Sequence, residues 1–235
     1  MLKHLRVFGT LHILVNGYKR LVICSDSRGH TDQGPSIEEF QKLFRAGKRT
    51  ACCTSGLLML PPGIHTSNLI ETICSEEELW DSPRDLLCAI RDATRERITE
   101  LFLDGAVPEI PSVFGAICVR RKSNGQLDLL ELDFPILTAP NGSRSFGEPT
   151  MKIRFDGVFA SFLYTHSRGD CLPQNMQHRI DPDLPDNDLL AAVDEVFRAA
   201  RMTSKSCADE VGGSIDVAAI DSKGFCWLRR KPIRL

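Results

Sequence analysis

The chain has 235 residues, the length of one domain of generous size that can bury a substantial core. With 29 Lys and Arg against 31 Asp and Glu, the net charge of −2 gives no broad positive field, which excludes nucleic acid as the default partner. The composition is that of a globular protein at 42% hydrophobic and 26% charged, and no apolar run approaches the roughly 20 residues of a membrane span.

The first quarter of the chain predicts two antiparallel hairpins. Asn16-Gly17 is a tight-turn signal between two short runs rich in Val, Ile and Leu. Gly47-Lys48 separates two further strand-like runs in the same way. The predicted strands are 10–16, 20–25, 40–44 and 50–54.

Two helices are predicted next. The first covers 66–73. The second starts at Ser82-Pro83, an N-cap followed by proline at the first helical position, and its apolar residues recur at helical spacing until Gly105.

The second half returns to strands around one more helix. Apolar residues at helical spacing from Leu189 to Ala200 predict that helix, introduced by Pro185-Asp186. The strands predicted around it are 113–119, 127–132, 152–155, 158–163, 215–220 and 225–228. Hairpins interrupted by helices favour an α+β fold in which helices cover the outer faces of two packed sheets. No linker divides the chain.

Four polar positions gain meaning from their spacing. Taken singly, Thr10, Asp26, Lys42 and Gly56 are typical of a strand threonine, a turn carboxylate, a surface lysine and a turn glycine. They stand, however, in a fixed series of short motifs. The motifs are Gly9-Thr10, Ser25-Asp26-Ser27-Arg28, Lys42-Leu43-Phe44, Thr54-Ser55-Gly56 and, near the other end, Gly212-Gly213-Ser214-Ile215-Asp216.

In this order the motifs resemble the catalytic β subunits of proteasomes and their bacterial relatives, which are N-terminal nucleophile (Ntn) hydrolases. The resemblance runs from Thr10 to Leu228 and is faint between Pro61 and Asp186. It implies a four-layer αββα sandwich of two antiparallel sheets flanked by helices. It also implies that residues 1–9 are a propeptide and that 10–235 form a single hydrolase domain.

The resemblance assigns a role to each of the four residues. Thr10 is the nucleophile, and cutting the Gly9–Thr10 bond frees an α-amine that can take the hydroxyl proton. Lys42 lowers the pKa of these groups, and Asp26 holds Lys42 in place. The backbone N–H of Gly56 stabilises the oxyanion. The expected activity is that of an autoprocessed threonine peptidase.

The resemblance also nominates a substrate pocket and supporting residues. The pocket positions are Gly29, Phe40, Phe44, Thr54 and Leu58. Their apolar character predicts a preference for a hydrophobic residue before the scissile bond, while the alternative is that the larger ones are ordinary core residues. The supporting positions are Arg28, Asp209, Gly212 and Gly213.

Several positions depart from the family pattern. Leu11 replaces a frequent hydroxyl residue, and Val211 stands where a serine usually helps to hold the catalytic amine. Leu60-Pro61-Pro62-Gly63 interrupts the helix expected after Gly56, and Phe155-Asp156-Gly157-Val158 is the nearest match to an expected Gly-Ser-Gly segment. Two alternatives therefore stay open: an inactive proteasome-like scaffold or regulatory subunit, and an Ntn amidohydrolase acting on a small amide.

The cysteines and histidines indicate no metal site. Nine cysteines without a C-x-x-C pair predict reduced thiols in a cytoplasmic protein, and the six histidines lack ligand spacing. Cys24 and Cys53 remain alternative nucleophiles. The basic segment 229–234 is expected to be solvated or to contact another subunit. The resemblance implies a polypeptide substrate, no cofactor, a homo-oligomeric ring and a possible ATP-dependent unfoldase partner.

Overall fold

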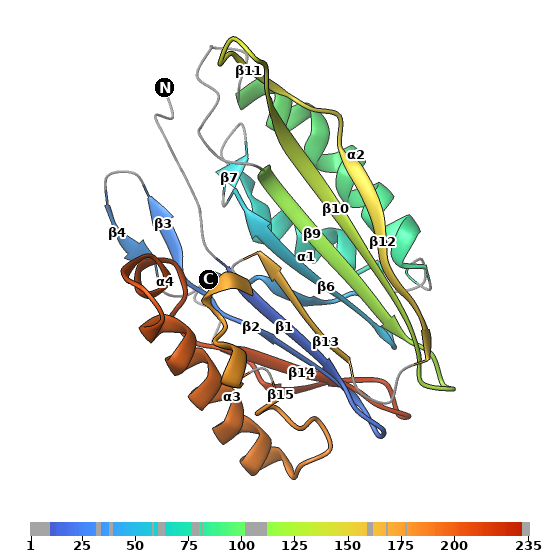
Figure 1. The fold of residues 1–235 in the computed structure, drawn as a ribbon. Coiled ribbons are helices and arrows are strands. Elements are labelled where there is room, and N and C mark those ends of the chain that lie inside the picture. Colours follow the sequence, from blue (N-terminus) through green and yellow to red (C-terminus); the bar gives the residue numbers. More distant parts are fainter. Residues whose placement is uncertain are drawn as a thin grey trace.

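The computed structural model of the chain describes residues 10–31, 34–37, 40–57, 59–60, 64–76, 80, 82–101, 112–158, 162–167, 169–176 and 178–231. This part of the chain is an α+β structure with two large antiparallel sheets (Figure 1). The predicted fold class is confirmed at this level. The predicted propeptide lies outside the described residues.

The five-stranded sheet joins the beginning of the chain to its end. Its spatial order is β13 (Phe162–Ser167), β1 (Leu11–Asn16), β2 (Leu21–Ser25), β14 (Asp216–Ile220) and β15 (Phe225–Arg229). All of its pairs are antiparallel. The N-terminal hairpin therefore forms the centre of this sheet, with distant strands on both sides.

The six-stranded sheet contains the second hairpin. Its order is β11 (Arg144–Phe146), β10 (Gln126–Thr138), β9 (Ser112–Arg121), β6 (Thr50–Gly56) and β5 (Leu43–Arg45), and β12 (Thr150–Val158) also pairs with β10. Two small ribbons are separate: β3 (Gly29–Thr31) with β4 (Gly34–Ile37), and β7 (Met59–Leu60) with β8 (Ile64–His65).

The helices lie on opposite sides of the pair of sheets (Figure 1). On one side are α1 (Thr66–Cys74) and α2 (Pro83–Leu101), and on the other are α3 (Asp186–Met202) and α4 (Lys205–Glu210). Two 3₁₀ turns, η1 (Gly169–Cys171) and η2 (Gln174–Met176), precede α3. No helix in the described ranges is both long and apolar enough to cross a membrane.

Buried apolar side chains form three clusters. β1 contributes to two of them, one on each face of its sheet, and is therefore rich in apolar residues. Alternate residues Leu11, Ile13 and Val15 pack with α3, whereas Leu14 packs toward the six-stranded sheet. Side chains of α1 and α2 pack on the outer side of the six-stranded sheet. Strands buried on both faces read as continuous apolar runs rather than alternating ones.

Most predicted elements are confirmed, with differences where pairing rather than local sequence decides. Both hairpins form, and the helices predicted at 66–73, from Ser82 and from Asp186 are present, while the predicted end at Gly105 lies outside the described residues. The strand predicted at 158–163 is wrong, because β12 pairs with β10 as far as Val158 and β13 starts at Phe162 to pair with β1.

The prediction that every cysteine is a reduced thiol is wrong for one pair. Cys171 in η1 and Cys207 in α4 form a disulfide with a Cα–Cα distance of 5.6 Å. The other seven cysteines are thiols. Spacing gave no signal, because the two partners are 36 positions apart and folding alone brings them together.

The basic segment near the end is also not simply solvated. Lys231 is buried, and its Nζ lies 3.3 Å from the Asp216 carboxylate and donates to the carbonyl oxygen of Phe40. Arg229 pairs with Asp194 at 2.7 Å. Burial lowers the pKa of Lys231 to about 8, against the opposing effect of Asp216. Residues 232–234 of the segment lie outside the described part.

Candidate active site

The four residues picked out by spacing meet at one end of the sheets. Thr10 precedes β1, Asp26 follows β2, Lys42 precedes β5 and Gly56 ends β6. Thr10, Lys42 and Gly56 line the same narrow cavity, whose volume is about 10 Å³. Asp26 is fully buried beside Lys42.

Asp26 ties three segments of the chain together. Its Oδ1 accepts a hydrogen bond from the N–H of Leu11 at 2.9 Å, and its Oδ2 accepts one from the N–H of Gly212 at 3.1 Å. The Nζ of Lys42 lies 3.5 Å from Oδ1. Burial raises the pKa of Asp26, while the Lys42 ammonium and the backbone donors oppose that shift.

Lys42 is held from both sides. Its Nζ donates to the carbonyl oxygen of Arg28 at 2.5 Å, in addition to the pair with Asp26. Its backbone carbonyl accepts from the N–H of Thr54 at 2.9 Å, which fixes it against β6. The residue is only 3% exposed, and burial lowers its pKa against the opposing effect of Asp26.

Gly56 occupies a position that only glycine fits. Its φ is +96°, and a Cβ there would overlap the carbonyl oxygen of Val113 and lie 2.8 Å from Cα of Phe114. The next N–H, of Leu57, still donates to Val113 at 3.1 Å. The chain thus turns out of the sheet at Gly56 while staying in contact with β9.

Arg28 and Gly212 support the loop after β2 together. The N–H groups of Ser27 and Arg28 donate to the carbonyl oxygen of Gly212 at 3.0 and 2.9 Å, and the Arg28 guanidinium donates to Ala208. A Cβ at Gly212 would lie 2.5 Å from Cζ of Arg28, so a larger residue there would displace the guanidinium. Gly213 has a φ of +74° in the same turn.

Neither Asp209 nor Val211 is suited to the role that the resemblance implies, which is to hold the catalytic amine. Asp209 is exposed on α4 and does not line the cavity. Val211, at the position of the family's serine, is buried among the apolar side chains that pack with α3.

Among the predicted pocket residues, only Thr54 belongs to the described lining of the cavity. Phe44 belongs to the core under α1 and α2, and Phe40 stacks on His65 with ring centroids 5.2 Å apart. Gly29 lies in β3, and Leu58 is outside the described residues. The alternative that the larger predicted pocket residues are buried core residues holds for Phe40 and Phe44.

The remaining described lining is mostly polar and was not predicted from the sequence. The further described residues around the cavity are Gln41, Ser55, Leu57, Thr66 and Ser67. Ser55 could have been inferred from its place beside Gly56. Thr66 and Ser67 could not have been inferred, because their position at the cavity depends on the path of the chain between Gly56 and α1.

Cys24 and Cys53 are poorly suited to act as nucleophiles. Both are buried, and burial raises the pKa of Cys24 to about 12 and that of Cys53 well above its usual value. A thiol attacks as its thiolate, so neither is activated at neutral pH. Asp170, Cys171 and Cys207 form a group of metal-ligand types, but its two sulfur atoms are bonded to each other.

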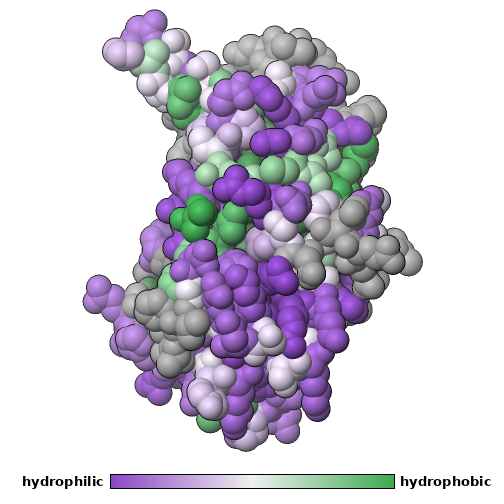
Figure 2. All heavy atoms as spheres, turned by 90° about the vertical axis from the view of Figure 1, so that its right-hand side faces the viewer, coloured by the Kyte–Doolittle hydropathy of each residue, from purple (hydrophilic) through white to green (hydrophobic). Residues whose placement is uncertain are grey.

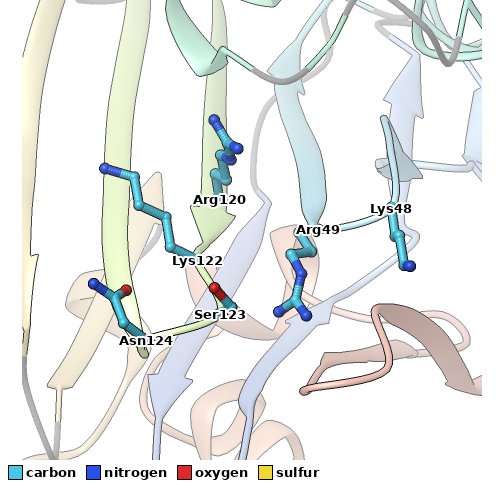
Figure 3. A pocket seen from close by; sticks show the side chains of 6 residues that line it. All are labelled: Lys48, Arg49, Arg120, Lys122, Ser123 and Asn124. Atoms are coloured by element: carbon cyan, nitrogen blue, oxygen red, sulfur yellow. The ribbon is translucent and has the colours of Figure 1, made fainter.

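A larger hollow lies at the opposite end of β6 and β9. It has a volume of about 490 Å³ and is lined by Lys48, Arg49, Arg120, Lys122, Ser123 and Asn124 (Figure 3). Arg49 is engaged with the carbonyl oxygens of Asp221 and Ser222, and Lys122 pairs with Asp128 at 3.0 Å. In Figure 3 the basic side chains point in different directions, so they do not converge on one ligand position.

A scan of the chain against protein-family models gives no match, and a search of curated proteins finds no significant similarity. The geometry of the cavity, together with the motif resemblance, is therefore the basis for assigning a function.

Proposed function

We propose that the protein is a threonine peptidase of the proteasome β-subunit type, activated by cleavage between Gly9 and Thr10. One observation carries the proposal. A threonine, a buried Lys42–Asp26 pair and a glycine with an obligatory positive φ meet at one cavity, although 46 positions separate Thr10 from Gly56.

We also propose that the architecture is the four-layer αββα sandwich of Ntn hydrolases. The three apolar clusters support this, since they alternate with the layers. One lies between α3 and the five-stranded sheet, one between the two sheets, and one between the six-stranded sheet and the pair α1 and α2. In Figure 1, α1 and α2 lie on one side of the two sheets and α3 lies on the other, which supports the proposed arrangement.

The processing step uses groups of this chain and one water molecule. Oγ1 of Thr10 attacks the carbonyl carbon of Gly9, and the carbonyl oxygen becomes an oxyanion beside the N–H of Gly56. The C–N bond between Gly9 and Thr10 breaks, and the proton lost by the hydroxyl ends on the departing nitrogen. Water then hydrolyses the resulting ester, which leaves a carboxylate on Gly9 and a free amine on Thr10.

In the processed enzyme the amine of Thr10 is the general base. It takes the hydroxyl proton as Oγ1 attacks a substrate amide and returns it to the leaving nitrogen. A positive charge on Lys42 favours the neutral amine and the developing alkoxide. Asp26 positions that charge through the ion pair at 3.5 Å.

Intact-mass measurement of the purified protein tests the proposal. The expected mass is that of the chain lacking residues 1–9, while Thr10→Ala keeps the full mass because the attacking hydroxyl is gone. Thr99→Ala is the matched control, since Thr99 lies on α2 and donates to Arg95 away from the cavity. A wild-type chain that keeps residues 1–9 and cleaves no peptide would contradict the proposal.

The inactive-subunit alternative has a specific observation in its favour. Asp209 is exposed and Val211 is apolar, so the family's usual support for the amine is altered. An inactive subunit would stay at full mass and bind peptides without turnover.

The small-amide alternative is supported by the described residues around Thr10, which are mostly polar rather than apolar. Turnover by the processed protein of hydrophobic peptide reporters and of small acyl amides separates the two activities. Cleavage of acyl amides alone would replace the peptidase by an amidohydrolase.

The resemblance further leads us to propose a cytoplasmic homo-oligomeric ring that encloses the sites. Such a ring would admit polypeptides delivered by an ATP-dependent unfoldase. The exposed apolar side chain of Ile153 on β12 supports assembly, because β12 pairs only with β10 among the described strands and a second copy of the chain would cover this edge.

A further inference from the structure

We propose that the hydroxyl of Thr66 is a catalytic group, which donates a second hydrogen bond to the oxyanion beside the N–H of Gly56. The inference rests on the function proposed above and adds a side chain that the motif resemblance does not include. It follows from the burial of Thr66, its place in α1 and the size of the cavity that it lines.

Thr66 carries a buried hydroxyl in need of a partner. The residue is 4% exposed, and its Oγ1 has no hydrogen-bond partner among the described residues. The other threonines of the described helix segments, Thr72, Thr94 and Thr99, donate to the carbonyl four positions earlier. Thr66 is the first residue of α1, so no helical carbonyl stands there. An unsatisfied buried hydroxyl destabilises the fold, which favours a ligand that restores the bond.

The N-terminal end of α1 adds a positive electrostatic field, which favours a negative charge. His65, the N-cap residue, makes no side-chain capping bond, and the first turn contains no acidic residue. The positive end of the nine-residue helix is thus not neutralised by its own side chains. Thr66 and Ser67 place this end at the cavity. A negative charge forming there is stabilised by the helix as well as by individual donors.

The cavity fits one oxygen atom rather than a side chain. Its volume of about 10 Å³ is close to the minimum that holds a single water, about 10–15 Å³. Thr10, Gly56 and Thr66 all line it, so an oxygen placed there is near the nucleophile and near both donors. None of its described lining residues is acidic, and Lys42 contributes the one formal positive charge among them.

The chemistry requires no proton transfer from Thr66. When Oγ1 of Thr10 attacks the carbonyl carbon, the C=O electron pair moves onto the carbonyl oxygen. The Thr66 O–H and the Gly56 N–H donate to that oxygen while the tetrahedral intermediate exists, and the pair returns as the C–N bond breaks. The same two donors act on Gly9 during processing and on the substrate afterwards.

Thr66→Val and Thr66→Ser test the role, since valine keeps the shape without the hydroxyl and serine keeps the hydroxyl. We expect valine to lower kcat about 100- to 1000-fold with KM little changed, as for the loss of one oxyanion donor. Serine should stay within a few-fold of wild type. Processing at Gly9–Thr10, followed by intact mass, should slow in the same order.

A binding measurement separates this role from a structural one. A peptide boronate, which forms a tetrahedral adduct with the nucleophile, should lose affinity for Thr66→Val, whereas a non-hydrolysed peptide should bind as to wild type. Thr99→Val is the control variant. If valine prevents folding, comparing Thr66→Ser with Thr66→Ala still isolates the hydroxyl.

Wild-type kcat, processing and boronate affinity in Thr66→Val would overturn the inference and leave the proposed function intact. A raised KM at unchanged kcat would overturn it as well, because it would show ground-state binding only. A wild-type chain that is never processed and cleaves nothing would remove the proposed function and this inference with it.

Discussion

Burial disfavours the charged forms of both Asp26 and Lys42, and the attraction between the two charges opposes this effect. Water is excluded from the pair, so desolvation raises the pKa of Asp26 and lowers that of Lys42. Their mutual attraction and the donors from Leu11 and Gly212 work in the opposite direction. The Lys42 ammonium beside Thr10 therefore depends on the Asp26 carboxylate.

Asp26→Asn should therefore move the pH dependence of the processed enzyme. Without the carboxylate, which raises the pKa of Lys42, that pKa falls further and the ammonium is lost at a lower pH. The alkaline limb of kcat/KM should shift to lower pH, as measured with a peptide reporter. Asp209→Asn is the control, since Asp209 is exposed away from the cavity. An unchanged alkaline limb in Asp26→Asn would show that the Lys42 charge is not needed.

At the residue scale, sequence spacing predicts the members of the site that follow fixed local motifs. Thr10, Asp26, Lys42 and Gly56 each sit at a strand end, and two hairpins determine where strand ends meet. Thr66 approaches through the segment after Gly56, whose path no local pattern determines. Lys231 reaches the carbonyl oxygen of Phe40 from 191 positions away, so its burial could not be inferred from a basic segment.

At the scale of elements, local turn and cap chemistry made the hairpins and helices predictable. Asn16-Gly17 closes β1 and β2 through a bond from Gly17 to Arg20 at 2.9 Å, and Pro83 starts α2. The sequence did not predict the boundary between β12 and β13, because β12 pairs with β10 whereas β13 pairs with β1. Long-range pairing leaves little trace in the strand's own residues.

The disulfide between η1 and α4 should contribute measurably to stability. Cys171→Ser is expected to lower the free energy of unfolding by about 2–4 kcal/mol, since the bridge restricts the unfolded chain. Urea unfolding with and without reductant measures the effect. Reductant should destabilise wild type and leave Cys171→Ser unchanged, and Cys226→Ser, at an exposed thiol, should match wild type. Equal stability of all three proteins in both conditions would contradict a stabilising bridge.

At the scale of the whole molecule, the β12 edge of the six-stranded sheet is where the proposed ring contact would lie. Ile153 on β12, which pairs only with β10 among the described strands, is 62% exposed. Figure 2 shows hydrophobic side chains gathered between hydrophilic regions on the face where β10, β12 and α2 lie. Exposed apolar side chains on an edge strand favour association.

Ile153→Glu should therefore weaken self-assembly. In sedimentation or light scattering, wild type should have a mass several times that of one chain, and the variant should shift toward a single chain. Tyr18→Glu is the matched control, since Tyr18 is 84% exposed but follows β1 in the other sheet. A single-chain mass for wild type would contradict the proposed ring, and an assembled Ile153→Glu would place its contacts elsewhere.

The bond from Gly212 to Asp26 links positions 186 residues apart, and β14 pairs with β2 beside it. Contacts of such sequence separation form late in folding, because the chain must first close a long loop. The carboxylate that holds Lys42 thus acquires its last backbone donor only when the distant segment has docked. Under the proposed function, self-cleavage would follow the completion of folding, and a chain whose second half misfolds would keep residues 1–9 and stay inactive.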